Sequence, residues 1–343
     1  MFKGHSRSHV FSSDSRSLAP KIAGMTLPRT TARVWFDPVV EEGKFLPEGP
    51  RALGDTIVWV NIQTAADGAT GQLYEADFAD PNSVILHELP GRPGFALPTD
   101  QPGKWLLGID HVIGVYDTAI GLWTPLAMLP NPDPRVIIND GEVAPDESTV
   151  VFGTKDTRFE EPIAHLYLFT PADNRLTVLL GGQTCSNGKV FADLGRTLFD
   201  IDTPRKVVTR YRFDAAERTL SENGIAIDLR DRADFPDGMC DCCDGTVIIA
   251  FYNPAFAEAG LAVRYDLATG AALEEWATPG SPRVTCPCLV QRPDGVKLLV
   301  TTATEGMPAE MRMRCPDAGK LFVAETPIES IPTQALVRLR ASR

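Results

Sequence analysis

A block of about fifty residues recurs along this chain, and each block carries strand patterns without helical periodicity. Four short polar motifs mark the repeat, centred on Asn139, Asn187, Asp237 and Thr285, which lie 48, 50 and 48 residues apart. An apolar run follows each motif and begins at position 149, 197, 246 or 296. An earlier motif at 47–50 stands about two blocks further upstream. Repeats of roughly 40–50 residues with about four strands each are typical of β-propeller blades. We therefore expect six blades between residue 48 and the C-terminus.

The apolar runs are rich in Val, Ile, Tyr, Phe and Thr, which suit the pleated surface of a strand. They occur at 57–62, 104–109, 149–152, 165–169, 197–201, 207–213, 246–252, 261–265, 296–301 and 321–324. Asp-Gly pairs at 67–68, 244–245 and 294–295 indicate hairpin turns between them. The predicted fold class is all-β: a six-bladed propeller with four antiparallel strands per blade, occupying residues 31–343 as one domain.

A propeller also needs its ring closed and its strand edges paired. We expect residues 31–40 to pair with the last blade near residues 320–324. The first thirty residues are rich in Ser and Arg and lack the apolar stretch of a secretory signal. For residues 1–30 we predict a disordered arm.

The repeat also predicts where polar side chains meet. The innermost strand of each blade lines the central channel of a propeller. A motif at the same point of every block would thus reach the same end of that channel. Glu48, Asn139, Asn187 and Asp237 should converge although they are far apart in sequence.

The net charge and the cysteine content indicate which classes of partner and which cellular environment to expect. The net charge is −12, which argues against nucleic acid and anionic membranes as partners and leaves a small molecule. No apolar run approaches the ~18–20 residues of a membrane span. The seven cysteines are odd in number, and a chain of this size needs no disulfide staples. We expect reduced cysteines in a cytoplasmic protein that is a monomer or a weak homodimer.

In order and spacing, the motifs resemble those of the senescence-marker-protein/gluconolactonase/regucalcin family of propellers. They read Glu48-Gly49-Pro50, Asn139-Asp140-Gly141, Ser186-Asn187-Gly188, Pro236-Asp237-Gly238 and Thr285-Cys286. The resemblance runs from about residue 31 to the end. It implies a lactonase with one divalent cation in the channel. The implied metal ligands are Glu48, Asn187 and Asp237, and Asn139 would help to hold the substrate.

The residue chemistry agrees with that implication. Two carboxylates and an amide supply only oxygen donors, which suits Ca²⁺ best, with Zn²⁺, Mn²⁺ or Mg²⁺ as alternatives. Three protein ligands leave positions open for water and substrate. We expect metal-assisted ester hydrolysis, in which Asp237 is the general base and then the general acid. Whether Asp140 binds substrate or only orients its loop is left open.

One position departs from the family pattern. Sugar-acid lactonases of this family usually carry an arginine two residues before the asparagine matched by Asn139, and this chain has Ile137 there. Arg135 lies two residues further back, on the same strand face but about 7 Å away. We predict Arg135 as a partial substitute. The loss favours a less polar lactone, or another ester, as the substrate.

Three other functions compete with the lactonase hypothesis. They are a non-enzymatic calcium-binding propeller, a phosphotriesterase-like hydrolase on the same metal, and a propeller that binds other proteins. A rival metal site is conceivable at Cys240, Cys242, Cys243, Cys286 and Cys288, because clustered thiolates bind soft metals. Free cysteine is more often a buried apolar residue, and we favour that interpretation. Long loops at 253–260 and 307–316 are expected either to shape a binding site or to be plain surface loops.

Overall fold

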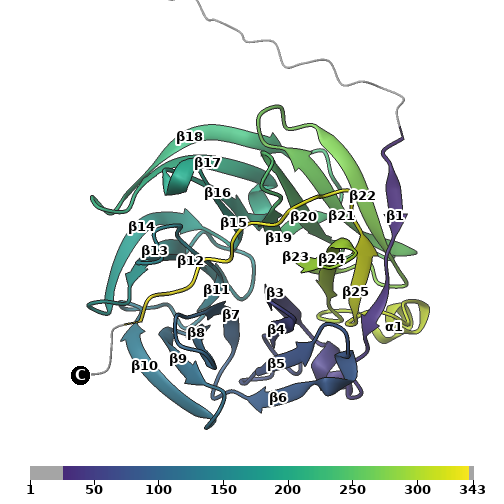
Figure 1. Ribbon diagram of the computed structural model, residues 1–343, viewed down its shortest axis with the longest axis horizontal. Coiled ribbons are helices and arrows are strands. Elements are labelled where there is room, and N and C mark those ends of the chain that lie inside the picture. Colours follow the sequence, from purple (N-terminus) through teal and green to yellow (C-terminus); the bar gives the residue numbers. More distant parts are fainter. Residues whose placement is uncertain (1–25, 340–343) are drawn as a thin grey trace, which may run out of the picture.

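The computed structural model describes residues 26–339 and is a ring of six β-sheets around a central channel (Figure 1). Every blade contains four antiparallel strands in meander order. The fold prediction is thereby confirmed. Within the described residues the only α-helix is α1 (Ala309–Arg314), and four short 3₁₀ turns accompany it. No helix in this part of the chain is long and apolar enough to cross a membrane.

The blades follow one another along the chain, each running from the channel outward. Blade one contains β3 (Pro47–Leu53), β4 (Thr56–Asn61), β5 (Gln72–Asp77) and β6 (Ile85–Glu88). Blade two contains β7 (Pro93–Pro98), β8 (Lys104–Ile109), β9 (Val112–Asp117) and β10 (Leu122–Met128). Blade three contains β11 (Val136–Val143), β12 (Val150–Asp156), β13 (Ala164–Thr170) and β14 (Arg175–Gln183).

The second half repeats the pattern. Blade four contains β15 (Ser186–Ala192), β16 (Thr197–Asp202), β17 (Val207–Asp214) and β18 (Thr219–Asp228). Blade five contains β19 (Phe235–Asp241), β20 (Thr246–Tyr252), β21 (Ala259–Asp266) and β22 (Ala272–Pro279). Blade six contains β23 (Val284–Arg292), β24 (Gly295–Thr302) and β25 (Leu321–Glu325) from the C-terminal part of the chain.

The N-terminal part of the chain completes blade six. Strand β2 (Arg33–Phe36) pairs antiparallel with β25, and Val34 lies opposite Phe322. This is the predicted closure, and it ties the two ends of the propeller together. The sequence did not predict β1 (Arg29–Thr31), which adds a fifth strand to blade five, parallel to β22. Ordered structure therefore begins before the expected boundary at residue 31. The rest of the predicted arm, residues 1–25, lies outside the described residues.

The core is divided among the blade interfaces. Each of six hydrophobic clusters lies between two neighbouring blades. Middle strands are buried on both faces, which explains their continuous apolar sequence: in β20, the five residues Val247 to Phe251 are fully buried. Outer strands such as β6 and β10 face solvent on one side and read as mixed sequence.

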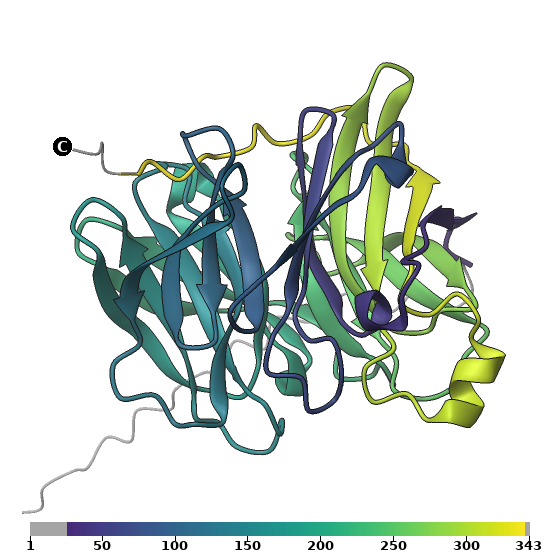
Figure 2. The same cartoon turned by 90° about the horizontal axis from the view of Figure 1, so that it is seen from below.

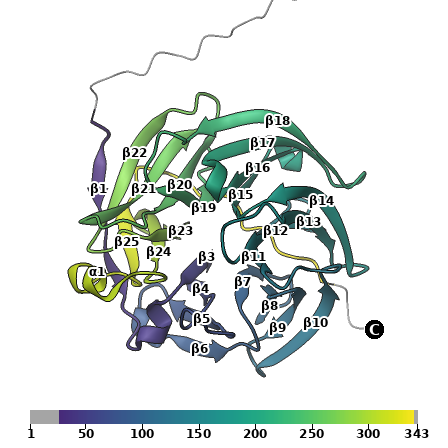
Figure 3. The same ribbon diagram turned by 180° about the vertical axis from the view of Figure 1, so that it is seen from behind.

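The two ends of the channel differ. After β25 the chain crosses one end of the ring, and this C-terminal strap (residues 326–339) reaches blades two and three (Figures 1 and 3). Val337 is fully buried and bridges to Thr99, and Arg338 pairs with Glu147. Helix α1 lies at the opposite end, as the side view shows (Figure 2). The strap thus covers one mouth of the channel and leaves the α1 side for access.

Candidate functional site

The pairing register of every inner strand contains a break, and in four of these strands the break falls at the polar motif that lines the cavity. The breaks fall between Glu48 and Arg51 in β3, Ile138 and Gly141 in β11, Asn187 and Lys189 in β15, and Pro236 and Met239 in β19. The corresponding breaks in β7 and β23 follow Pro93 and Val284. A bulge bends its strand and re-aims a side chain. The repeated motif is therefore a repeated bulge that turns its residues into the channel.

The motif glycines sit where neighbouring inner strands come closest. A Cβ on Gly238 would lie 2.5 Å from the sulfur of Cys286 in the next blade. A Cβ on Gly188 would lie 2.5 Å from the backbone nitrogen of Met239. Only glycine permits these approaches, which bring the motifs of adjacent blades within reach of one another.

A cavity of about 490 Å³ opens at the α1 end of the channel. Glu48, Asn139, Asn187 and Asp237 all line it, from blades one, three, four and five. Each is at most 8% exposed. The structure thus brings together the four residues that the motif spacing predicted to converge.

Hydrogen bonds fix the amide side chains across three blades. Asn139 Nδ2 donates to Asn187 Oδ1 at 3.1 Å and to the Ser186 carbonyl at 2.9 Å. Asn187 Nδ2 donates to Thr203 Oγ1 at 2.8 Å, and the Thr203 hydroxyl donates to the Pro236 carbonyl at 2.9 Å. The orientation of Asn187 is therefore set from both sides, and its Oδ1 lies on the Asn139 side.

The carboxylates of the cavity form no ion pair among the described residues, although the charge of Lys155 acts on both through space. Burial raises the pKa of Glu48 well above its ordinary value, and the negative charge of Asp237 raises it further. Burial likewise raises the pKa of Asp237, followed by the charge of Asp140. No Lys or Arg of the described chain forms an ion pair with Glu48 or Asp237, although Gly49 N donates to Glu48 Oε2 at 2.8 Å. Two buried carboxylates and an amide oxygen in one cavity fit a hard divalent cation.

The comparison with known proteins agrees with these observations. The model of the SMP-30/gluconolactonase/LRE-like region matches residues 46–304, which span all the motifs. The chain belongs to this family.

Individual relatives agree with the assignment. A predicted sugar lactone lactonase of Rhizobium meliloti is 27% identical over 299 residues, 83% of this chain and 94% of that protein. Regucalcin of Xenopus laevis is 26% identical over 227 residues, 65% of this chain and 73% of that protein. Among solved structures, a calcium-binding protein, regucalcin, from Agrobacterium tumefaciens superposes with a TM-score of 0.76 at 25% identity. That superposition covers 92% of this chain and all of the other.

The family's arginine position is buried and apolar here. Ile137 is fully buried and does not line the cavity. Directly opposite it on β12 stands Lys155, whose side chain does line the cavity and is 6% exposed. No sequence pattern singled out Lys155. The signal was its place just after the Gly153-Thr154 pair, but its alignment with Ile137 depends on a strand register that the sequence did not reveal.

Arg135, predicted as a partial substitute for the family arginine, lies beside the loop that follows β12. It is not among the residues that line the cavity. Its guanidinium pairs with Glu161 at 3.1 Å and lies 3.9 Å from Asp156. Asp156 accepts hydrogen bonds from three backbone amides of residues 158–161. Burial alone would raise the pKa of Asp156, but these donors lower it. Arg135 thus supports the loop that follows β12.

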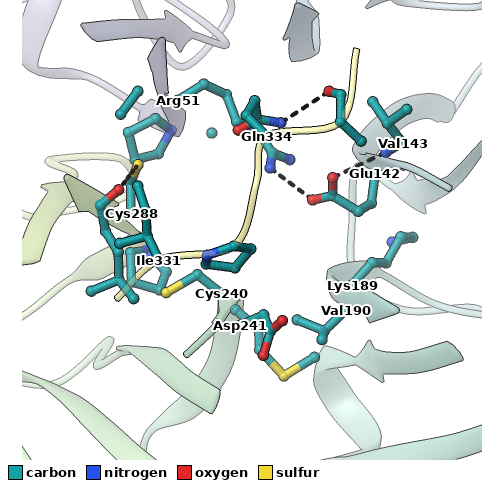
Figure 4. Close-up of a pocket in the computed structure, with 18 of the residues that line it drawn as sticks. Arg51, Glu142, Val143, Lys189, Val190, Cys240, Asp241, Cys288, Ile331 and Gln334 are labelled. Atoms are coloured by element: carbon teal, nitrogen blue, oxygen red, sulfur yellow. Dashed lines mark hydrogen bonds and ion pairs between the residues drawn. The ribbon is translucent and has the colours of Figure 1, made fainter. Parts of the chain in front are cut away.

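Asp140 also lies apart from the predicted substrate group. It lines a second cavity, of about 730 Å³, at the strap end of the channel. Figure 4 shows this cavity, where Arg51 pairs with Glu142 at 2.7 Å beneath the strap residue Gln334. Asp140 therefore sits between the two ends, and its charge acts on Glu48 and Asp237 through space.

The cysteines lie in several places: Cys185 lines the α1-side cavity, Cys243 is exposed, and others line the second cavity or the core. All seven are free thiols. Cys240 and Cys288 line the second cavity (Figure 4), as does Cys286, while Cys242 is packed in the core between blades five and six. Burial raises the pKa of the Cys240 and Cys286 thiols well above the ordinary value. Within residues 26–339, no group of three or more His, Cys, Asp or Glu side chains is arranged to hold a metal ion.

Proposed function

We propose that this protein is a metal-dependent hydrolase that opens the ester ring of a lactone in the α1-side cavity. The observation that carries the proposal is the convergence of Glu48, Asn187 and Asp237, with Asn139 beside them, in that one cavity. Membership of a family that includes gluconolactonases supports the reaction class. The surplus of buried carboxylates supports a cation as cofactor.

Glu48, Asn187 and Asp237 would hold the divalent cation through oxygen atoms. Ca²⁺ fits this all-oxygen set best, and Zn²⁺, Mn²⁺ and Mg²⁺ are alternatives. When bound, such a cation polarises a lactone carbonyl and stabilises the charge that develops on its oxygen. The negative charges of Glu48 and Asp237 would balance the two positive charges of the cation.

Asp237 would move the proton. Its carboxylate takes a proton from the attacking water while the water oxygen forms a bond to the carbonyl carbon. The ring C–O bond then breaks, and the leaving alkoxide takes the proton back from Asp237. The amide of Asn139 would orient the substrate.

The proposal is tested with purified protein stripped by a chelator and reloaded with each cation. We expect lactone hydrolysis that requires the cation, and loss of most of it in Asp237→Asn. The matched control is Asp241→Asn, on the same strand but lining the strap-side cavity. Equal loss in both variants, or hydrolysis that survives the chelator, would contradict the proposal.

A calcium-binding protein without hydrolase activity is the second candidate. It is favoured by the likeness to the calcium-binding regucalcin of Agrobacterium tumefaciens. Titration calorimetry with Ca²⁺ separates the two. One bound ion per chain, lost in Asp237→Asn and accompanied by no hydrolysis of any lactone, would support the binding protein over the enzyme.

A further inference from the structure

A buried lysine without an ionic partner lies in the wall of the α1-side cavity. Lys155 ends the cavity-lining part of β12 and is 94% buried. In the described part of the chain its ammonium makes no hydrogen bond and no ion pair. Its recorded contact is the face of Phe159, with the ammonium 5.9 Å from the ring centroid. The ammonium is not one of the fully buried polar atoms without a partner, so it is open to the cavity that the side chain lines.

The other buried basic side chains show the usual arrangement. Lys189 donates to Ser186 Oγ at 2.9 Å and pairs with Asp200. Lys297 pairs with Glu325 at 2.6 Å, and Arg283 donates to backbone carbonyls. Among the described residues that are buried to this degree, Lys155 alone among the basic side chains lacks such a partner. A molecule bound in the cavity could therefore provide the partner that the protein does not.

Lys155 is not held in an ion pair by the carboxylates of the cavity and is therefore available to bind a ligand. Glu48 and Asp237 together carry two negative charges, which a divalent cation would neutralise. Neither carboxylate forms an ion pair with Lys155, whose positive charge lowers the pKa of both through space. With the cation in place, Lys155 is the basic side chain in the wall of the cavity, and the charge of Asp140 acts on it through space.

The cavity is also polarised across its width. Lys155, Thr157 and Phe159 form the wall on blade three, and Tyr252 and Glu305 belong to blade five and the loop after β24. Glu305 thus lines the cavity from blade six, across the ring from blade three, and its negative charge acts on Asp237. A bound molecule would be oriented with its negative end towards blade three.

We propose that Lys155 binds a carboxylate carried by the substrate, so that the preferred substrate is a carboxylate-bearing lactone rather than a neutral one. This rests on the proposed function and replaces the less polar lactone expected from the loss of the family arginine. Lys155 stands directly opposite Ile137 in the register of β11 and β12. The neighbouring strand thus provides a positively charged side chain, Lys155, opposite the position where the family carries its arginine. Lys155 is a specificity-determining residue and takes no part in the proton transfer.

The test compares two lactones that differ by one charge: D-glucaro-1,4-lactone, which carries a carboxylate, and D-glucono-1,4-lactone, which does not. In the wild type, kcat/KM should favour the anionic lactone. Lys155→Met should lower that preference by about tenfold, mainly through KM, because a charge-assisted contact to the substrate is lost. Lys155→Arg should restore most of the preference. An unchanged preference in Lys155→Met would overturn the proposal.

Two further measurements separate this inference from its alternatives. Arg135→Met tests the other cation of blade three, and a larger loss of preference there than in Lys155→Met would overturn the assignment. Thermal unfolding tests a structural role: Lys155→Met should unfold at the same or a higher temperature, because an unpaired buried charge is removed. A lower unfolding temperature together with equal activity losses on both lactones would indicate that Lys155 acts only in the fold.

Calorimetric measurement of ligand binding tests the inference without requiring that the protein hydrolyse any lactone. Calorimetry on the Ca²⁺-loaded protein should show tighter binding of D-glucarate than of D-gluconate, and Lys155→Met should weaken glucarate binding by about tenfold. If no lactone is hydrolysed but this pattern appears, the proposed hydrolase fails while the anion site stands. If lactones are hydrolysed but glucarate binds no better than gluconate, the hydrolase stands and the anion site fails.

Discussion

Asn139 and Asn187, from the inner strands of blades three and four, are joined by a hydrogen bond of 3.1 Å between Nδ2 and Oδ1. The bond spans 48 residues of sequence, one full repeat. It links the residue expected to orient the substrate to a residue expected to hold the metal. A change at either position should therefore affect the other.

Asn139→Ala removes this bond and the bond to the Ser186 carbonyl. We expect the free energy of unfolding to fall by about 1–3 kcal/mol, because buried partners are left unsatisfied. Lactone hydrolysis and Ca²⁺ affinity should fall with it. Denaturant unfolding and calorimetry measure both effects. Asn223→Ala, on the exposed strand β18, is the control. Unchanged Ca²⁺ affinity in Asn139→Ala would contradict the coupling.

The stability of the metal-free protein should depend on pH through Glu48 and Asp237. Their folded-state pKa values are raised by burial, so the folded protein retains protons that the unfolded chain has released. The resulting stability is present below the unfolded pKa values of about 4 and is lost as pH rises through the folded values. Added Ca²⁺ should therefore stabilise the protein more at neutral than at acidic pH.

Melting curves with and without Ca²⁺ at acidic and neutral pH check this expectation. The double variant Glu48→Gln, Asp237→Asn should lose both the pH dependence and the Ca²⁺ effect. Stabilisation by Ca²⁺ that persists undiminished in the double variant would place the cation elsewhere.

Lys189 and Asp200 form a fully buried pair, with Nζ 3.2 Å from Oδ1 and both side chains 1% exposed. Burial raises the pKa of Asp200 to about 6, against the lowering effect of Lys189. Lys189→Met should destabilise the protein by about 3–5 kcal/mol, because it leaves an uncompensated buried carboxylate. The loss should be smaller at pH values low enough to protonate Asp200.

An exposed pair provides the control for this comparison. Arg230, which is 63% exposed, pairs with Asp228 on the surface. Arg230→Met should leave the free energy of unfolding almost unchanged, because solvent screens an exposed pair. Equal costs for the two variants in urea unfolding would contradict the account of the buried pair.

Gly238→Ala should disturb both stability and the site. The new Cβ would lie 2.5 Å from the sulfur of Cys286 and 2.8 Å from its Cα. Backbone must shift to relieve this, at a cost of about 1–3 kcal/mol, and the shift would move the adjacent Asp237. Gly245→Ala separates steric clash from backbone strain, because Gly245 has φ of +83° but open space around it. Gly245→Ala should cost about 1 kcal/mol and leave Ca²⁺ affinity unchanged. Normal Ca²⁺ affinity in Gly238→Ala would show that the close approach is not needed.

Much of the fold was readable from the sequence because a propeller is a repeat of local units. Regular spacing gave the blade number, and strand composition gave positions such as β8 and β20, whose bounds match the predicted ranges. Closure by β2 followed from the need to pair an open edge. Strand β1 was missed because its partner, β22, lies far away in sequence and pairs with it in parallel.

The sequence by itself determined which oxygen-bearing side chains share one end of the channel, since a repeat places equivalent residues at equivalent heights. Only the tertiary structure decided which basic side chain lies in the same cavity. Register between β11 and β12 sets Lys155 opposite Ile137, whereas Arg135 turns to Glu161. It likewise decided that Asp140 faces the strap-side cavity. Side-chain direction at a bulge depends on the local register of two strands, and no spacing rule in one strand contains that information.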